Sequence, residues 1–303
     1  MRATQANATT EPFPVWITGA GGLIGNALVE SAAELVPSWQ IYGLTRSSLE
    51  LLDTDAVRTM WTRTQPKLVI HCAAMSHTPA CDKNPELAKR VNVNVTALLC
   101  SLASGVRFFF FSTDQVFDGH TGNYNETAQR NPFNVYGETK AAAEDLVLSN
   151  PNHTVIRTSL NGGVSPTGDR GFNERLRIAF RNGETVRLFI DEYRTPIPAM
   201  ETARAVWELA IRNAAGAYHV AGAERLSRWE IGQLIAQRWT SGPHGSASLP
   251  QLQPRLEPCS LANFPGPRRG PDTSLNCSKA QQLLSFPLPR LSHWLAARPE
   301  LMF

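Results

Sequence analysis

The sequence predicts an α/β fold in which a doubly wound parallel sheet carries helices on both faces. As far as about residue 160, short apolar segments alternate with helix-like segments, which is the pattern that parallel βαβ units give. The segment 106–111 ends in four consecutive phenylalanines, and a strand covered on both faces requires such a continuous apolar run. After residue 160 the alternation ends, and we expect a smaller C-terminal α+β lobe.

The first half of the chain supplies the elements of the sheet in a regular order. Leu28 and Leu35 lie seven residues apart and share one face of the first helix. Asp53 or Thr54 is suited to cap the second helix, and Pro85 is suited to the first turn of the third. We expect strands at 13–18, 40–44, 67–71, 106–111 and 154–157, and helices at 26–35, 53–64, 85–103 and 134–148.

The second half of the chain is less regular. The segment 161–171 is a loop of Gly, Pro and Ser, and 241–271 is rich in the same residues and poor in apolar ones. We expect the longer of these segments to be an irregular lid or surface loop. The predicted helices are 172–181, 202–213 and 228–239, and the predicted short strands are 186–190 and 217–220.

Three evenly spaced glycines follow the first strand. Gly19 would make a tight turn, Gly22 would let the backbone approach a pyrophosphate, and Gly25 would let the helix pack closely on the strand. The helix N-terminus, which includes Leu23 and Ile24, would present free N–H groups to phosphate. A glycine run alone would be no more than a turn, but its place between a strand and a helix indicates a dinucleotide site.

The pair Tyr136 and Lys140 is the second chemical signal in the chain. The two residues stand four apart in a segment that is predicted to be helical, so they share one face. A lysine ammonium beside a phenol stabilises the phenolate and lowers the pKa of the tyrosine. A phenol tuned in this way can pass a proton to or from a carbonyl–alcohol pair. Taken alone, this spacing is also typical of an ordinary solvated helix face.

Composition argues against several classes of function. The net charge of +3 over 303 residues is small, and no basic stripe that could bind nucleic acid stands out. No apolar run reaches the length of a membrane span. The five cysteines form no C-x-x-C pair, and neither they nor His71 and His77 complete a set of metal ligands. Cysteines without a disulfide framework fit a reducing cytoplasm. We therefore expect a cytoplasmic protein that binds no nucleic acid, membrane or metal.

Three motifs occur together and in a fixed order along the chain. They are the glycine turn, the segment Ser112-Thr113-Asp114-Gln115-Val116-Phe117-Asp118-Gly119, and the Tyr136/Lys140 pair. In this order they resemble the extended short-chain dehydrogenase/reductases, and within these dTDP-4-dehydrorhamnose reductase and its relatives. The resemblance covers nearly the whole chain and includes the segments 157–159, 191–196 and 269–276.

The resemblance implies a Rossmann-like domain and a smaller substrate lobe. We expect a disordered tail at 1–12, an NAD(P)-binding domain at 13–160 and a mainly substrate-binding lobe at 161–303. Parts of 191–220 are expected to return to the first domain. Asn92 matches a family position that ties a helix to a strand, and we interpret it as structural.

The resemblance also implies a catalytic trio of Thr113, Tyr136 and Lys140. The Thr113 hydroxyl would hydrogen-bond the carbonyl oxygen of the substrate, at the carboxyl end of a strand, where open α/β sheets bind ligands. Tyr136 would donate a proton as hydride reaches the carbonyl carbon. Lys140 would lower the tyrosine's pKa and bind the nicotinamide ribose. Without these partners, Thr113 would be interpreted as a cap or a strand-end hydroxyl.

The cofactor is expected to be NADP(H), with NAD(H) as the alternative. NAD-binding folds place an acidic residue at the end of the second strand, whereas this strand ends at Leu44-Thr45-Arg46-Ser47. The guanidinium of Arg46 suits a ribose 2′-phosphate, and an ordinary exposed loop cation is the alternative interpretation. The other cofactor contacts that the resemblance implies are Glu50 and Leu51 at the adenine, and Ala73, Ala74 and Met75 under the pyrophosphate and ribose.

Four further residues are implied at the substrate, namely Asp114, Gln115, Leu160 and Arg269. Relatives that reduce the rhamnose precursor usually carry Tyr at the position of Gln115 and Trp at that of Leu160, so two aromatic platforms for a sugar are absent. Arg269 is a candidate contact for the diphosphate of a sugar nucleotide, and Gly270 follows it where the family often has Pro. These departures concern the sugar and leave the hydride chemistry intact.

These inferences predict an NADPH-dependent reductase of a 4-keto sugar nucleotide, of the type that serves dTDP-L-rhamnose biosynthesis. Its partner would be the small-molecule sugar nucleotide, and a homodimer is compatible with the resemblance. One alternative is an epimerase or dehydratase of the same extended family, although Gln115 is no proton carrier and argues against a dehydratase. The other is a non-catalytic dinucleotide-binding subunit, like the regulatory β subunit of methionine adenosyltransferase, against which the intact Tyr136 and Lys140 argue.

Overall fold

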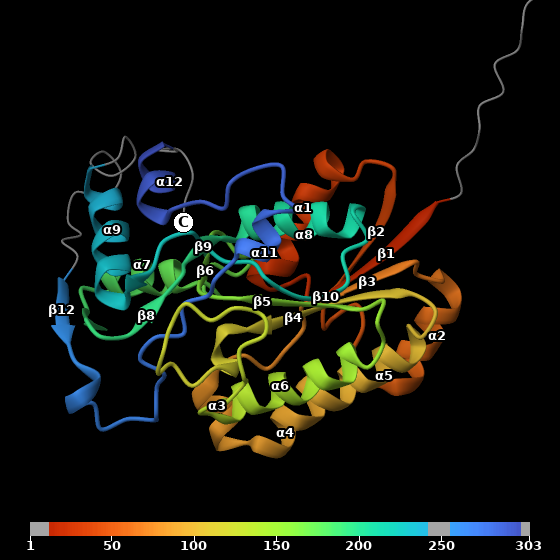
Figure 1. The fold of residues 1–303 in the computed structure, drawn as a ribbon, viewed down its shortest axis with the longest axis horizontal. Coiled ribbons are helices and arrows are strands. Elements are labelled where there is room, and N and C mark those ends of the chain that lie inside the picture. The colour runs from red at the N-terminus through yellow and green to blue at the C-terminus, as the bar shows by residue number, and fades with distance from the viewer. Residues whose placement is uncertain (1–11, 242–254, 298–303) are drawn as a thin grey trace, which may run out of the picture.

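The centre of the molecule is a sheet of six parallel strands in the order β10-β5-β4-β3-β1-β2 (Figure 1). The computed structural model describes residues 12–241 and 255–297. The strands of the sheet are β1 (Phe13–Thr18), β2 (Trp39–Leu44), β3 (Leu68–His71), β4 (Arg107–Thr113), β5 (Thr154–Thr158) and β10 (Gly216–His219). All but the last residue of the predicted tail at 1–12 lie outside the described residues.

Helices cover both faces of this sheet. On one face lie α1 (Leu23–Leu35) and α8 (Ala199–Ile211), and on the other lie α2 (Thr54–Thr64), α5 (Val95–Leu102) and α6 (Val135–Leu148) (Figure 1). A parallel sheet needs this cover because the connection between successive strands passes over one face or the other. The predicted doubly wound, Rossmann-like sheet is therefore confirmed.

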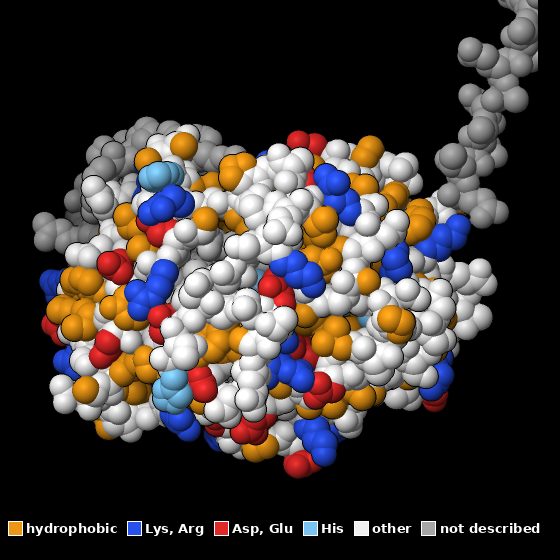
Figure 2. Space-filling model, viewed as in Figure 1, with side chains coloured by type: hydrophobic (Ala, Val, Ile, Leu, Met, Phe, Trp, Pro, Cys, Tyr) orange, Lys and Arg blue, Asp and Glu red, His pale blue; other side chains and the backbone are white. Residues whose placement is uncertain are grey.

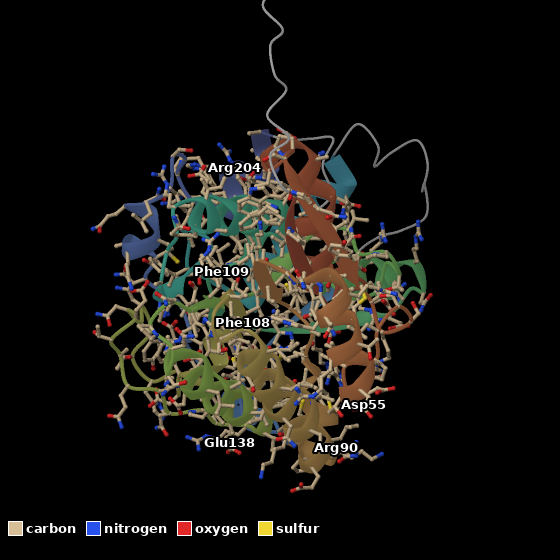
Figure 3. All side chains as sticks on the ribbon, turned by 90° about the vertical axis from the view of Figure 1, so that its right-hand side faces the viewer. Asp55, Arg90, Phe108, Phe109, Glu138 and Arg204 are labelled. Atoms are coloured by element: carbon tan, nitrogen blue, oxygen red, sulfur yellow. The ribbon has the colours of Figure 1, made fainter. Side chains whose placement is uncertain are left out.

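The four phenylalanines of β4 join the two halves of the core. Phe109 and Phe111 pack in the cluster that contains Trp207 of α8, whereas Phe108 and Phe110 pack with the helices of the opposite face. Figure 3 shows Phe108 and Phe109 deep inside the molecule. None of the four is more than 5% exposed, and burying each contributes roughly 1.5–3 kcal/mol relative to exposure. The strand that ends at the predicted catalytic threonine is therefore anchored on both sides.

The helix predicted at 85–103 is present, but it is not a regular α-helix throughout. The segment is divided into α4 (Pro85–Lys89), a π-helical turn η1 (Arg90–Asn94) and α5, and a short α3 (Thr78–Lys83) that the sequence does not predict precedes them. The wide turn contains Asn92, whose side chain accepts from Met75 N (2.8 Å) and donates to Met75 O (3.1 Å) and Thr139 Oγ1 (2.9 Å). Asn92 thus ties the loop after β3 to α6, which confirms its predicted structural role.

A buried ion pair holds α6 against β5. Arg157 Nη2 donates to Glu144 Oε2 at 2.7 Å, and Arg157 Nε donates to both oxygens of the same carboxylate. Arg130 Nη1 adds a contact of 3.2 Å to Glu144, which is completely buried. A buried charge is tolerated only where its partners satisfy it, so this network fixes the rotation of α6 and its position along the sheet.

The second lobe has an apolar core of its own. Its cluster packs α7 (Phe172–Arg181), α9 (Arg228–Ser241) and α12 (Leu291–Ala297) with the parallel pair β7 (Thr185–Phe189) and β12 (Arg255–Cys259). Two further pairs join two-residue strands, β6 (Asn161–Gly162) with β9 (Ile197–Pro198) and β8 (Tyr193–Arg194) with β11 (Leu226–Ser227). The prediction that 241–271 is irregular is wrong for part of its described length, because that part contains β12 and a short 3-10 helix, η3 (Leu261–Asn263). Residues 242–254 of this segment lie outside the described residues.

Parts of the C-terminal half return to the sheet. β10 pairs with β5, α8 packs beside α1, and α11 (Ser278–Gln281) lies next to β10. Ala280, Phe286 and Leu288 belong to the same apolar cluster as residues of β1 and β3. The two lobes therefore share core residues and are not joined by a single linker.

The surface carries charges of both signs. Figure 2 shows one face of the molecule, where lysine and arginine side chains are interspersed with aspartate and glutamate. Within the described ranges, no helix combines the length and apolarity that crossing a bilayer requires. The same residues contain no group of three or more histidine, cysteine or acidic side chains that could hold a metal ion.

Candidate active site

The glycine turn between β1 and α1 has a geometry that requires glycine at two positions. Gly19 adopts a left-handed φ of +70°, and a Cβ there would lie 2.6 Å from the backbone N of Ala73. A Cβ on Gly25 would lie 2.3 Å from Gly19 O, so the helix packs directly on the turn. Gly22 N donates to Gly19 O at 2.9 Å and closes the turn.

The N-terminus of α1 is suited to receive an anion. Gly22 is the N-cap and offers no side chain to the first N–H groups. The first turn, which begins with Leu23 and Ile24, holds no acidic residue. Uncapped N–H groups and the positive end of the helix dipole attract phosphate. The glycine turn and this helix end therefore fit the pyrophosphate of a dinucleotide.

The loop after β3 lies between the glycine turn and α6. Ala73 is the residue that Gly19 approaches, and Ala74 and Met75 follow it, all three partly buried. Met75 packs against the apolar cluster that contains Tyr136 of α6. The predicted cofactor contacts of this loop therefore lie between the glycine turn and the predicted catalytic tyrosine. An extended dinucleotide would have to span the same distance.

Helix α6 begins close to the end of β4. Asn134 is its N-cap and accepts from Gly137 N at 2.7 Å, as its predicted start requires. A Cβ on Gly137 would lie 2.3 Å from Gln115 O, so glycine allows the helix to approach the turn that follows β4. This contact brings the first turn of α6, with Tyr136, to the carboxyl end of the sheet.

Thr113, Tyr136 and Lys140 lie buried in the same region. They are 6%, 9% and 2% exposed, respectively. The Thr113 hydroxyl is close enough to the Tyr136 phenol to influence its pKa. Lys140 Nζ lies 3.8 Å from the centre of the Phe110 ring, on the strand that ends at Thr113. The structure thus brings the three predicted catalytic residues together at one strand end.

Lys140 is a buried lysine whose Nζ has no hydrogen-bond acceptor among the described residues. Burial lowers its pKa from 10.5 to about 7, and the Glu144 carboxylate and Cys72 thiol oppose this shift. Glu144 is engaged with Arg157 and does not pair directly with the lysine. A buried ammonium needs acceptors, and the hydroxyls of a nicotinamide ribose would supply them.

The pKa of Tyr136 departs from the prediction. Burial raises it above its ordinary value, the Asp114 carboxylate raises it further, and the Thr113 hydroxyl offsets this only in part. The prediction that Lys140 lowers this pKa is wrong for the structure, because burial favours the neutral form of both groups. Tyr136 is therefore protonated at neutral pH and is equipped to donate a proton.

Three of the predicted substrate residues are engaged within the chain. Asp114 is 4% exposed, and its carboxylate accepts hydrogen bonds from neighbouring hydroxyls. Gln115 Oε1 accepts from Asn134 Nδ2 at 2.8 Å and so steadies the N-cap of α6. Leu160 is partly buried and packs against the apolar cluster of the second lobe. Asp114 and Gln115 lie beside Thr113, whereas Leu160 belongs to the lobe core.

The turn after β2 lies beside the glycine turn, since a Cβ on Gly21 would be 3.8 Å from Thr45 Cγ2. The Arg46 side chain in this turn is 81% exposed, and its Nε lies 3.5 Å from Glu50 Oε2. An exposed pair of this kind contributes roughly 0–1 kcal/mol, so the guanidinium is free to exchange it for a phosphate. Leu51 is partly buried against the core below the sheet.

A cluster of arginines surrounds Glu192 in the second lobe. Arg194 Nη2 lies 2.8 Å from Glu192 Oε1, and Arg269 Nε lies 2.6 Å from Glu192 Oε2. Burial alone would raise the pKa of Glu192, but Arg194 and Arg269 together hold it down to about 2. The predicted contact Arg269 is therefore one member of a larger group.

Arg228 adds a further guanidinium to this arginine cluster. Its guanidinium stacks 3.9 Å over the Phe172 ring and makes no side-chain hydrogen bond to a described residue. Burial lowers its pKa to about 10, Glu192 opposes the shift, and Arg175 is among the neighbouring cations that add to it. The sequence gives no signal for this group, because its members come from separate elements between residues 175 and 269.

The matches to known proteins agree with this geometry. A family model described as the RmlD substrate binding domain matches residues 14–300, which is nearly the whole chain. The chain belongs to the RmlD substrate binding domain family. The predicted resemblance to dTDP-4-dehydrorhamnose reductase and its relatives is confirmed at the level of this family.

Two relatives of the chain have different roles. A probable low-salt glycan biosynthesis reductase, Agl14, of Haloferax volcanii is 30% identical over 297 residues, covering 93% of this chain and 96% of the relative. The methionine adenosyltransferase 2 subunit beta of Xenopus laevis is 28% identical over 300 residues, covering 93% and 86%.

Solved structures share the RmlD-family fold. A hypothetical dTDP-4-dehydrorhamnose reductase from Sulfolobus tokodaii has a TM-score of 0.78 and 27% identity, covering 92% of this chain and 97% of its own. The dTDP-4-dehydrorhamnose reductase of Bacillus anthracis, solved in complex with NADP, has a TM-score of 0.83 and 23% identity, covering 94% and 98%. At 23% identity, the similarity to the Bacillus anthracis structure supports the fold alone.

Replacing Gly19 with alanine is expected to lower the free energy of unfolding by roughly 1–3 kcal/mol, because its left-handed φ and the Ala73 backbone leave no room for a Cβ. Gly21→Ala is the matched control, since a Cβ there meets nothing closer than 3.8 Å. It should change the unfolding free energy by less than about 0.5 kcal/mol. Urea denaturation of both variants measures the difference, and equal destabilisation would contradict the geometry.

The lowered pKa of Lys140 predicts a pH dependence of stability. The pKa of Lys140 is about 7 in the folded chain and 10.5 in the unfolded chain. Between these two pH values, the unfolded chain binds a proton that the folded chain does not. Stability therefore rises with pH in this window, by about 1.4 kcal/mol per pH unit when the difference is a full proton. Relative to Lys140→Met, the wild type should gain roughly 2 kcal/mol between pH 7 and 9 in urea denaturation. A constant difference between the two proteins would show that the lysine titrates normally.

Proposed function

We propose that this chain is an oxidoreductase that reduces the keto group of a sugar nucleotide with a nicotinamide cofactor. The observation that carries the proposal is the burial of Thr113, Tyr136 and Lys140 at one strand end, next to a loop that leads back to the glycine turn. Membership of the RmlD substrate binding domain family supports it. Ligands of open α/β sheets bind at this end of the strands.

The protonation state of Tyr136 sets the direction of the proposed chemistry. When bound, the nicotinamide supplies the hydride for the carbonyl carbon. Tyr136, which is protonated at neutral pH, donates its proton to the carbonyl oxygen as negative charge develops there. Thr113 positions the Tyr136 phenol from the end of β4, and Lys140 holds the ribose. A buried phenol with a raised pKa therefore suits reduction.

The cofactor that we propose is NADP(H), in preference to NAD(H). Arg46 lies in the turn beside the glycine turn, with its guanidinium largely exposed and only weakly paired with Glu50. No acidic residue stands at the end of β2 in the segment Leu44-Thr45-Arg46-Ser47. A 2′-phosphate would replace the Glu50 carboxylate as the partner of Arg46.

The anionic part of the proposed substrate would bind in the arginine cluster of the second lobe. Arg194, Arg228 and Arg269 act on the carboxylate of Glu192, and Arg194 also lies 3.5 Å from Asp114, so the arginines are in excess. The stacked guanidinium of Arg228 offers donors to a diphosphate without having to break an ion pair. These contacts and the trio together fit a 4-keto sugar nucleotide of the dTDP-4-dehydrorhamnose type.

A second candidate function is a regulatory subunit without turnover. It is favoured by the 28% identity over 300 residues to methionine adenosyltransferase 2 subunit beta of Xenopus laevis. Tight dinucleotide binding, no reduction of any keto sugar and a stable protein partner in pull-downs would support it. An epimerase or dehydratase would instead retain stoichiometric nicotinamide through dialysis.

Tyr136→Phe is expected to lower kcat by roughly 10²–10⁴-fold, because the variant lacks the proton that the carbonyl oxygen receives. The affinity for NADPH should stay within about twofold, as the phenol is not needed to hold the dinucleotide. The assay follows the nicotinamide absorbance band with dTDP-4-keto-6-deoxy-L-lyxo-hexulose, and fluorescence titration gives the NADPH affinity. Failure of the wild type to oxidise NADPH with this or any other nucleoside-diphosphate keto sugar would refute the proposed function.

Arg228→Met is expected to weaken binding of the sugar nucleotide by roughly 10–100-fold, which corresponds to loss of a charge-assisted hydrogen bond. Arg204→Met is the matched control, because Arg204 also stacks 3.9 Å over a phenylalanine, Phe286, but on α8. Figure 3 labels Arg204 at the outer edge of the molecule. Calorimetric titration with dTDP measures both variants without turnover, and equal affinities would argue against the cluster as the diphosphate site.

A further inference from the structure

Asp114 is a buried carboxylate whose contacts come from several segments of the chain. Its Oδ1 accepts from Thr113 Oγ1 at 3.1 Å, and its Oδ2 accepts from Ser159 Oγ at 2.8 Å and Thr273 Oγ1 at 2.9 Å. Arg194 Nε lies 3.5 Å from the same Oδ2. The residue is 4% exposed, so these contacts satisfy a charge that water hardly reaches.

The partners of Asp114 belong to both lobes. Ser159 follows β5 of the sheet, whereas Arg194 lies in β8 and Thr273 in the C-terminal segment. This segment is joined to β8, because Asp272 forms a bridge with Tyr193 and Thr273 N donates to Tyr193 O at 3.3 Å. The carboxylate is therefore fully satisfied only where the second lobe meets the end of β4.

The contact with Asp114 decides how Thr113 can bond. A hydroxyl has one proton to donate and two lone pairs to accept. The Thr113 proton is directed to Asp114, and one lone pair accepts from Gln115 N at 3.2 Å. One lone pair is left, on the hydroxyl that the Tyr136 phenol approaches. Asp114 thus sets the direction of a hydroxyl at the centre of the site.

We propose that Asp114 is a positioning residue whose carboxylate fixes the Thr113 hydroxyl and, through it, the Tyr136 phenol. The second lobe holds this carboxylate in place through Thr273 and Arg194. The proposal rests on the proposed function, because it assigns Asp114 a part in the same reduction. It replaces the prediction that Asp114 contacts the substrate directly, since its oxygens are already engaged.

The charges around Tyr136 support this role. Apart from burial, Asp114 is the largest influence that raises the pKa of the phenol, and Cys81 of α3 adds to it. On its own helix, Lys140 has a pKa of about 7 and so is only partly charged at neutral pH. From β4, the Thr113 hydroxyl acts in the opposite direction. Removing the Asp114 charge should therefore make the phenol easier to ionise.

Asp114→Asn tests the proposal in the full-length protein. The amide keeps the size of the side chain but removes its charge, so the alkaline limb of the kcat/KM profile should move to lower pH by about one unit. The value of kcat should fall by roughly tenfold or more, since the amide has one acceptor oxygen where the carboxylate has two and cannot hold the Thr113, Ser159 and Thr273 hydroxyls at once. The Kd for NADPH should stay within about twofold. An alkaline limb at the wild-type pH would overturn the proposal.

Thr273→Val is the matched control, because it removes one hydrogen bond to the carboxylate but leaves the charge in place. Its alkaline limb should stay within about 0.3 pH units of the wild type, because the charge on Asp114 is retained. A limb that shifts as far as that of Asp114→Asn would show that any disturbance of this contact moves the profile, and would refute the electrostatic role. Asp114→Ser provides a second neutral variant with the same expected shift if the asparagine variant does not fold.

A measurement without turnover separates this proposal from the proposed function. Ultraviolet titration of phenolate in the NADP-bound protein, with the spectrum of the matching Tyr136→Phe protein subtracted, reports Tyr136 alone. The phenolate should appear at lower pH in Asp114→Asn than in the wild type, whether or not any keto sugar is reduced. Identical titrations would overturn the role of Asp114, whereas a shift in a protein that turns over no sugar would refute only the proposed reaction.

Discussion

The site depends on the buried ion pair between Glu144 of α6 and Arg157 of β5. Tyr136, Lys140 and Glu144 are spaced by four residues, so they share the face of α6 that packs on the sheet. A shift or rotation of the helix would leave the charges of Glu144 and Arg157 unpaired in the core, which typically costs about 3–5 kcal/mol. The pair therefore fixes the register in which the phenol and the ammonium reach the end of β4.

Burial then determines the chemistry of these two groups. The same desolvation that raises the pKa of Tyr136 lowers that of Lys140, because each loses the hydration of its charged form. Lysine and tyrosine are thereby brought toward neutrality together, and the lysine serves less as a charge beside the phenol than as a donor in need of acceptors. This balance suits a site whose tyrosine delivers a proton.

The sheet and the glycine turn could be predicted because each has a local signature in the sequence. The family resemblance predicted that Thr113, Tyr136 and Lys140 act together, and the structure brings the three side chains into one region. Gly19 and Gly25 mark a strand–turn–helix unit, and the phenylalanines of β4 mark a strand covered on both faces. The direction of the Tyr136 pKa could not be predicted, since a neighbouring lysine is visible in the sequence but the depth of burial is not. The π-helical turn at Asn92 was equally hidden, because the hydrogen bonds that explain it reach Met75 and Thr139.

The arginine cluster was hidden for a related reason, which also explains how the lobes act together. Its members lie on elements far apart in the sequence and meet only because β8, α9 and the C-terminal segment converge around Glu192. Arg194 belongs at once to this cluster and to the contacts of Asp114 beside Thr113. An anion bound among the arginines would compete for the same guanidinium that compensates Asp114. The charge that acts on Tyr136 would therefore depend on whether an anion occupies the second lobe. Binding of that anion would then be coupled to the pKa of the phenol without any movement of the sheet.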